Sequence, residues 1–319
     1  MPGTMMTLSV VIPVYNEGEG IRLLAARLKE CLDGIGASWE VVLVDDHSSD
    51  GSPNVLRDVC AANPGFRFLR LSRNSGSHVA IIAGLEHCQG DCAVFLAADL
   101  QDPPELIGKL LELWRDGYRT VWAVRAGREG IPLGDRIASS LYYWLLRRFG
   151  EIAVPPDGSD FALIDRRVID ALIKSVGANP SLFNEIAKVG FRQTEVPYIK
   201  QARQYGTTKW DLQKKLKAFA DAFVSFSYAP VRAMSYLGIA FSLLGFLYAL
   251  FLFFMHYFGQ RAVPGFASLM VALLTVSGFQ MMMLGVLGEY LWRTLDESRH
   301  RPQYFLEDSS DSAPPREHP

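Results

Sequence analysis

The stretch Cys92–Ile107, CAVFLAADLQDPPELI, begins as a run of apolar residues and ends in oxygen-bearing side chains. Its first seven residues suit a strand that is buried on both faces of a sheet. Asp99, Gln101 and Asp102 follow, ahead of two prolines that open a helical pattern. In an open α/β sheet, ligands bind at the carboxyl ends of the strands. The stretch therefore predicts a strand with a ligand site at its end.

Strand-like and helix-like segments alternate on both sides of this stretch, up to about Ile199. The strand candidates are LSVVIPV, EVVLVDD, FRFLRL, CAVFLAA, TVWAVRA, SDFALI and QTEVPYI. The helical patterns are Gly20–Leu32, Pro53–Ala62, His78–Cys88 and Pro104–Arg115. This alternation predicts a mostly parallel sheet with helices on both faces. We expect an α/β fold in which residues 1–209 form one Rossmann-like domain.

Charged residues are balanced in number, but they are unevenly distributed along the chain. With 32 basic and 34 acidic residues among 319, no overall field attracts nucleic acid, and we expect no such partner. Asp, Glu, Lys and Arg are absent from Ala233 to Gln260 and again from Ala262 to Gly288. Each stretch exceeds the roughly 20 apolar residues that cross a bilayer core. We expect a membrane hairpin in residues 233–292, with transmembrane helices at about 236–258 and 266–289.

Basic residues flank this hairpin on one side. Residues 203–232 hold six basic and two acidic side chains, whereas the loop between the apolar stretches carries only Arg261. The positive-inside rule then places both termini and the large domain in the cytoplasm, at the inner (cytoplasmic) membrane. Residues 210–232 have the pattern of a basic amphipathic helix at the membrane surface. We expect residues 293–319 to be a cytoplasmic tail, disordered from Asp308 onward, and we expect no signal peptide at the N-terminus.

Three further strand ends carry polar clusters, PVYNEGEG, VDDHSSDGS and LSRNSGSHVA. Asp45 and Asp46 are suited to accept hydrogen bonds from a nucleobase edge and a ribose. Arg73 and the backbone amides around it suit an anion. Each cluster alone is equally typical of a turn. The candidate nucleotide-binding residues at these three ends are Pro13, Tyr15, Glu17, Asp45, Asp46 and Arg73.

Taken together and in this order, the four clusters resemble the GT-A nucleotide-sugar glycosyltransferases. More narrowly, the chain resembles the polyisoprenyl-phosphate glycosyltransferases, the group of dolichol-phosphate mannosyltransferase and bacterial bactoprenol glucosyltransferase. The resemblance extends from about Leu8 to Arg301. PVYNE and DDHSSD occur in many glycosyltransferases, whereas ADLQDPPEL, RQYGTTKW and SFSYAP are more specific to the lipid-phosphate group.

The resemblance implies a divalent metal, Mg²⁺ or Mn²⁺, at the end of the fourth strand. In the family a DxD segment holds the metal, which in turn holds the diphosphate, and such cations take oxygen ligands. Asp99 and Gln101 match the second Asp and the Gln, but Ala97 replaces the first Asp. Three alternatives stay open: Asp99, Gln101 and the diphosphate hold the metal alone, Asp102 contributes, or metal dependence is weaker.

The resemblance also implies sites for the acceptor and for catalysis. Arginine suits bidentate phosphate recognition. Arg203 and Lys209 belong to a glycine-containing loop that covers the nucleotide sugar in the family. Asp160 would lie near the reacting centre, as a base or as a positioning group. The residues implied for the lipid phosphate or the diphosphate are Arg125, Arg128, Arg136, Ser139 and Ser140.

These inferences predict an inverting hexosyltransferase with Asp160 and Asp99 as catalytic residues. It would move one sugar from a nucleotide-diphosphate sugar, a UDP-sugar by analogy with bacterial relatives, to polyprenyl phosphate such as undecaprenyl phosphate. Two alternatives remain: transfer to another lipid such as diacylglycerol, or a non-catalytic nucleotide-sugar-binding membrane partner, which Ala97 favours. The sequence leaves open the sugar and whether the chain forms a homo-oligomer.

Overall fold

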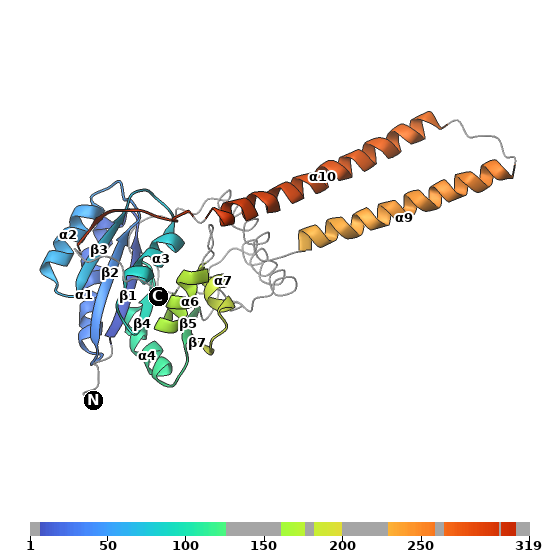
Figure 1. The fold of residues 1–319 in the computed structure, drawn as a ribbon. Helices are drawn as coiled ribbons and strands as arrows, with labels where there is room; N and C mark the ends of the chain where they lie inside the picture. Colours follow the sequence, from blue (N-terminus) through green and yellow to red (C-terminus); the bar gives the residue numbers. More distant parts are fainter. Residues whose placement is uncertain are drawn as a thin grey trace. The chain divides into compact units, whose positions relative to one another are not determined.

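The computed structural model describes residues 7–125, 161–175, 182–199, 229–258, 265–299 and 301–310 (Figure 1). The chain divides into two compact units, of which one holds a β-sheet with its helices and the other holds two long helices. Residues 210–228, most of the predicted amphipathic helix, lie outside the described residues.

The described residues of the first unit form an eight-stranded sheet in the order β7-β5-β6-β4-β1-β2-β3-β8. Strands β1 to β4 run parallel to their neighbours in this group, as do β5 and β7. Strands β6 and β8 run antiparallel to the strands beside them. The mostly parallel α/β sheet predicted from the sequence is therefore confirmed. The strands are β1 Thr7–Val14, β2 Ser38–Asp45, β3 Phe66–Leu71, β4 Cys92–Phe95, β5 Thr120–Arg125, β6 Phe161–Asp165, β7 Gln193–Tyr198 and β8 Leu306–Ser309.

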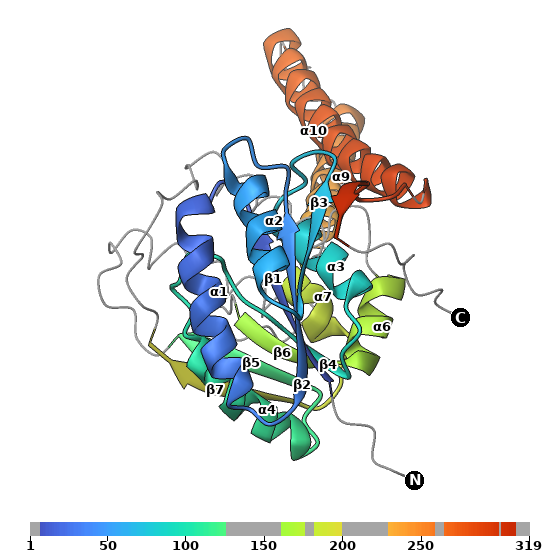
Figure 2. The ribbon, with the colours of Figure 1, turned by 90° about the vertical axis from the view of Figure 1, so that its left-hand side faces the viewer.

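Helices cover both faces of the sheet. Val10 and Ile12 of β1 are buried under α1, α2 and α4, whereas Val11 is buried with residues of α3, α6 and α7. Figure 2 shows α1 and α2 on one side of β1–β3 and α3 and α6 on the other. This two-sided burial explains why the strands are continuous apolar runs rather than alternating ones. The helices are α1 Gly18–Asp33, α2 Ser52–Ala62, α3 Ser77–His87, α4 Ile107–Arg115, α6 Arg166–Ser175 and α7 Leu182–Lys188, with a 3₁₀ turn at Pro104–Leu106.

The C-terminal strand β8 is the main departure from the sequence prediction. The predicted disordered tail begins at Asp308, but Asp308 and Ser309 lie in β8 and pair with Arg70 and Leu69 of β3. The strand LEDS is short and polar, and it is held by backbone pairing rather than by a buried apolar face. A segment of this kind has no hydrophobic periodicity for a sequence analysis to detect.

The second unit consists of α9, Ala229–Tyr257, and α10, Phe266–Ser298, which run side by side (Figure 1). The rings of Phe241 and Phe279 pack between them with centroids 4.4 Å apart. Many large apolar side chains along both helices are exposed, among them Ile239, Phe246, Leu269 and Met281. Within the described part of the chain, no helix is long and apolar enough to span a membrane.

Candidate active site

The polar loops predicted from the sequence meet at one edge of the sheet. Because β1, β2, β3 and β4 are mutually parallel, their carboxyl ends lie together. The end of β5 and the start of β6 reach the same edge, since Ala123 pairs with Phe161 and Phe95 with Ala162. This is the edge at which open α/β sheets bind ligands.

Backbone strain is concentrated in these loops. Among the described residues, three that are not glycine have positive φ: Asn16 at 54°, His47 at 58° and Leu100 at 61°. They follow β1, β2 and β4, respectively. Left-handed conformations cost free energy for residues with a Cβ and persist where the surroundings enforce them, often at functional sites. Their clustering supports this edge as the candidate functional site.

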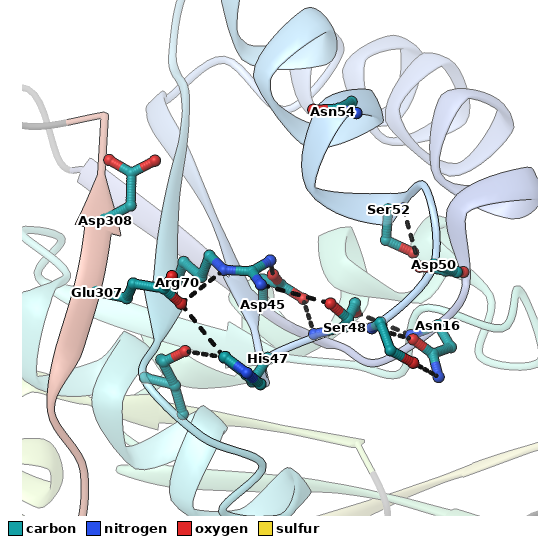
Figure 3. A network of polar contacts seen from close by, with 12 residues as sticks. Asn16, Asp45, His47, Ser48, Asp50, Ser52, Asn54, Arg70, Glu307 and Asp308 are labelled. Atoms are coloured by element: carbon teal, nitrogen blue, oxygen red, sulfur yellow. Dashed lines mark hydrogen bonds and ion pairs between the residues drawn. The ribbon is translucent and has the colours of Figure 1, made fainter.

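A hydrogen-bonded network joins the first two loops (Figure 3). Asp45, at the end of β2, is wholly buried, and its Oδ1 accepts a 3.0 Å hydrogen bond from the Ser48 amide. Its Oδ2 accepts from Arg70 Nη1 at 2.6 Å. The Ser48 hydroxyl accepts from the Asn16 amide at 2.9 Å. Asp45 therefore fixes the shape of these loops, in addition to any contact it makes with a ligand.

Asp46 ties the second loop to the third. Its carboxylate accepts hydrogen bonds from the amides of Ser75 at 2.7 Å and Gly76 at 2.8 Å. Burial raises the pKa of Asp46, while these two amides act in the opposite direction. The sequence predicts that the amides of this loop bind an anion, but two of them donate to Asp46. Arg73 in the same loop is exposed.

Asp102 holds the loop after β4 in place. Asp102 is wholly buried, and it accepts from the Tyr198 hydroxyl at 2.8 Å and from the Ala97 amide at 3.3 Å. Burial, and then the Asp102 carboxylate, raise the pKa of Tyr198. Asp99 is 8% exposed, and its Oδ1 accepts a 3.2 Å bond from the Gln101 amide. Asp102 is thus committed to structure, which disfavours it as a metal ligand.

The remaining predicted residues divide into two groups. Pro13, Tyr15 and Glu17 are partly buried at the end of β1 and the start of α1, and Arg125 is partly buried at the end of β5. Arg125 pairs in register with Tyr198, and its charge lowers the pKa of that phenol, against the larger effects of burial and Asp102. Seven predicted residues lie outside the described residues: Arg128, Arg136, Ser139, Ser140, Asp160, Arg203 and Lys209.

Comparison with known proteins agrees with this architecture. Residues 9–173 match the model of the family described as glycosyl transferase family 2. A Bacillus subtilis protein described as an uncharacterized glycosyltransferase, YkcC, is 39% identical over 301 residues, covering 94% of this chain and 93% of its own length. The chain belongs to glycosyl transferase family 2.

Relatives of this family 2 glycosyltransferase include proteins whose names state an acceptor, and its fold is shared by solved structures. The undecaprenyl-phosphate 4-deoxy-4-formamido-L-arabinose transferase of Edwardsiella ictaluri is 36% identical over 311 residues, covering 95% of this chain and 94% of that protein. The glucosyl-3-phosphoglycerate synthase of Mycobacterium tuberculosis, solved with Mn²⁺, UDP-glucose and phosphoglyceric acid, has a TM-score of 0.50 at 17% identity, covering 69% and 77% of the chains. The predicted relationship to polyprenyl-phosphate sugar transferases is confirmed.

The donor atoms in the loop after β4 fit a divalent cation only in part. Asp99 and Gln101 offer a carboxylate and an amide oxygen two positions apart, and both are ligand types that Mg²⁺ and Mn²⁺ accept. Within the described ranges, no group of three or more His, Cys, Asp or Glu side chains is arranged to hold a metal. A cation bound by Asp99 and Gln101 would therefore take most of its ligands from the diphosphate and water.

Three residues of the transferase's network were missed by the sequence analysis: Arg70, Tyr198 and Glu307. Arg70 is a charged residue within the apolar strand FRFLRL, and Tyr198 is the buried penultimate residue of QTEVPYI. A charge inside an otherwise apolar strand is itself a signal that a partner lies beside it. The partner's identity depends on strand register, which the sequence does not state.

We predict that Tyr198→Phe destabilises the transferase by about 1.5–3 kcal/mol, because it leaves a buried carboxylate oxygen of Asp102 without its hydroxyl donor. Urea denaturation of the full chain, followed by tryptophan fluorescence, measures this change. Tyr118→Phe is the matched control: Arg192 stacks on that ring at 4.1 Å and the ring is retained, so the shift should stay within about 0.5 kcal/mol. Equal stability of wild type and Tyr198→Phe would show that the Asp102 contact does not hold the loop.

Proposed function

We propose that the transferase moves one sugar from a nucleotide-diphosphate sugar to polyprenyl phosphate at the cytoplasmic face of the membrane. The observation that carries the proposal is the 36% identity, over 95% of the chain, to a transferase named for undecaprenyl phosphate. The retention of Asp99 and Gln101 at the ligand-binding edge of the sheet supports it further. A hexose carried by UDP is the donor we favour.

The reaction is a single displacement that inverts C1 of the sugar. A phosphate oxygen of the lipid attacks C1 while the bond from C1 to the diphosphate oxygen breaks, and the nucleoside diphosphate leaves with that electron pair. A phosphate monoester has a second pKa of about 6, so the lipid phosphate is largely dianionic at neutral pH. It needs no general base, and we assign Asp160 to orienting the sugar and steadying its developing positive charge. Asp99 and Gln101 would hold a divalent cation, which would supply positive charge to the leaving diphosphate.

Cationic side chains would hold the two anionic substrates. Arg125 ends β5 at the ligand-binding edge, which supports a phosphate-binding role for it. Arg203 and Lys209 would close over the donor. The further residues proposed for the lipid phosphate are Arg128, Arg136, Ser139 and Ser140.

We also propose that residues 233–292 anchor the enzyme as a two-helix membrane hairpin, with residues 210–232 at the interface and residues 1–209 and 293–319 in the cytoplasm. The charge-free sequence of α9 from Ala233 onward and the exposed apolar side chains of both helices support this. Such an anchor would bring a water-soluble donor site beside a lipid head group.

We predict that the purified full chain in liposomes containing undecaprenyl phosphate labels this lipid from one member of a panel of radiolabelled nucleotide sugars. Asp99→Ala should lower the rate by about 100-fold or more, since removal of one electrostatic stabiliser of the transition state typically costs that much. Thin-layer chromatography of the extracted lipids measures the product, and NMR of the glycosyl phosphate reports the anomeric configuration.

Parallel liposomes that contain diacylglycerol in place of undecaprenyl phosphate separate the rivals. Label in diacylglycerol alone would overturn the acceptor assignment. Retained binding of a nucleotide sugar without label in any lipid would instead favour a non-catalytic binding partner, which is the reading that Ala97 supports.

We predict that Mg²⁺ or Mn²⁺ binds measurably only in the presence of the nucleotide, because Ala97 leaves the loop one carboxylate short. Ala97→Asp should tighten metal binding without nucleotide and leave the fold intact, since Ala97 is partly exposed at the end of a strand. Calorimetric titration of wild type and variant, with and without UDP, tests both statements. Full transfer activity of wild type in EDTA would show that no catalytic metal acts here.

For the hairpin, we predict that reporter domains fused before Met1 and after Pro319 both read as cytoplasmic. A reporter inserted in the loop at residues 260–264 should read as external, because the positive charges that favour cytoplasmic retention flank the hairpin on its other side. Alkaline phosphatase and green fluorescent protein fusions provide the two opposite readouts. A cytoplasmic reading at the loop would exclude the hairpin.

A further inference from the structure

The C-terminal strand β8 lies beside β3, the strand that follows the β2 loop in the chain. Leu69 pairs with Ser309, Arg70 with Asp308 and Leu71 with Leu306, with an irregularity between Arg70 and Leu71. The pairing is extended at both ends by hydrogen bonds from the Ser72 amide to the Phe305 carbonyl and from the Phe68 amide to the Ser310 hydroxyl. This strand comes from the opposite end of the chain and covers the edge of the nucleotide-binding half of the sheet.

The two acidic side chains of β8 make different contacts. Asp308 accepts a 2.8 Å hydrogen bond from Arg57 of α2. Glu307 accepts a 2.9 Å hydrogen bond from Arg70 Nε and lies 3.2 Å from His47 Nδ1. His47 is one of the three residues with strained backbone in the site loops. Glu307 therefore reaches the candidate site, whereas Asp308 holds the strand against a helix.

Arg70 connects Glu307 to the centre of the network in Figure 3. Its Nε donates to Glu307 while its Nη1 donates to Asp45 at 2.6 Å, so two carboxylates hold one guanidinium from different sides. The Arg70 side chain is 15% exposed and that of Asp45 is 1% exposed. From Asp45 the contacts continue through the Ser48 amide and hydroxyl to Asn16. A continuous chain of hydrogen bonds thus runs from the C-terminal strand to the loops after β2 and β1.

We propose that Glu307 is a positioning residue for the nucleotide site. Arginine has a long side chain with many rotamers, and contacts at both ends of its guanidinium restrict it to one of them. A fixed Arg70 keeps Asp45 and the loops at residues 14–17 and 45–50 in one arrangement before the nucleotide arrives. Binding then loses less conformational entropy, which is the general benefit of preorganisation. The inference rests on the proposed function only in requiring that these loops bind a nucleotide.

The alternative is that β8 serves solely to cover a sheet edge. In that case the Glu307 and Asp308 contacts would be equivalent, and loss of either would affect stability alone. Substitution of Arg70 does not separate the two hypotheses, because it would leave the buried Asp45 carboxylate without its cationic partner and destabilise the fold. The Glu307 side chain is 48% exposed, so its substitution does not carry the free-energy cost of changing a buried residue. Asp308, next to it on the same strand and 40% exposed, is the matched control.

The experiment compares Glu307→Ala, Glu307→Gln and Asp308→Asn in the full chain, first by calorimetric titration with UDP and GDP in the presence of Mn²⁺. For the nucleotide that wild type binds, Glu307→Ala should weaken affinity by about two- to fivefold, the size expected for a partly exposed ion pair. Glu307→Gln should lose less, because its amide oxygen still accepts from Arg70. Asp308→Asn should bind as wild type does. Steady-state assays should place the Glu307→Ala effect in the donor KM, with kcat and acceptor KM unchanged.

A second readout needs no nucleotide. Hydrogen exchange of the Ser48 and Ser49 amides, which donate to Asp45 and Asn16, should be faster in Glu307→Ala than in Asp308→Asn. Equal affinities and equal exchange in the two variants, with similar losses of thermal stability, would overturn the proposal and leave β8 as an edge cover. Nucleotide binding that depends on Glu307 in a protein that transfers no sugar to undecaprenyl phosphate would sustain the inference and overturn the proposed acceptor instead.

Discussion

The parallel pairing of β1 with both β2 and β4 is the constraint on which the rest of the structure depends. It requires a crossover helix after each strand, so both faces of the sheet are covered and the strands are largely apolar. Polar and charged groups that are buried in such a sheet must be paired. Asp45, Asp46 and Asp102 obey this rule, since each is buried and each accepts at least two hydrogen bonds from within the domain.

The buried carboxylates at this edge have different structural roles. Asp45, Asp46 and Asp102 fix loops, and each is paired with a residue from another strand or helix start: Arg70, Gly76 and Tyr198, respectively. Asp99 Oδ1 accepts a hydrogen bond from the Gln101 amide of the same turn, and Asp99 stands next to Leu100, which has a left-handed backbone and a side chain buried in the core. Burial of the Leu100 side chain stabilises this strained turn, which places Asp99 at the edge of the sheet.

Much of this could be predicted from the sequence, because apolar runs that end in Asp, Asn or Ser predict both the strands and the edge at which the ligand binds. The four predicted helical segments also agree closely with α1 to α4. The pairing partners could not be predicted, since Arg70 opposes Asp45 only through the register of β2 and β3. For the same reason, the sequence alone predicts that the amides of Ser75 and Gly76 are available to an anion, although both donate hydrogen bonds to Asp46. β8 escaped detection because four mostly polar residues carry no periodic signal.

The position of β8 in the chain has a consequence for how the domain is completed. Phe68 and Ser310 are 242 residues apart and yet are hydrogen bonded. The edge of β3 therefore stays open until both long helices have been synthesised, and an open edge strand invites pairing with other chains. A fragment that stops before α9 would keep Asp45 and Arg70 but lose Glu307, so Arg70 would be held from one side only. The sheet is thus complete only when the segment that follows α10 is present, which links the arrangement of the loops after β1 and β2 to that segment.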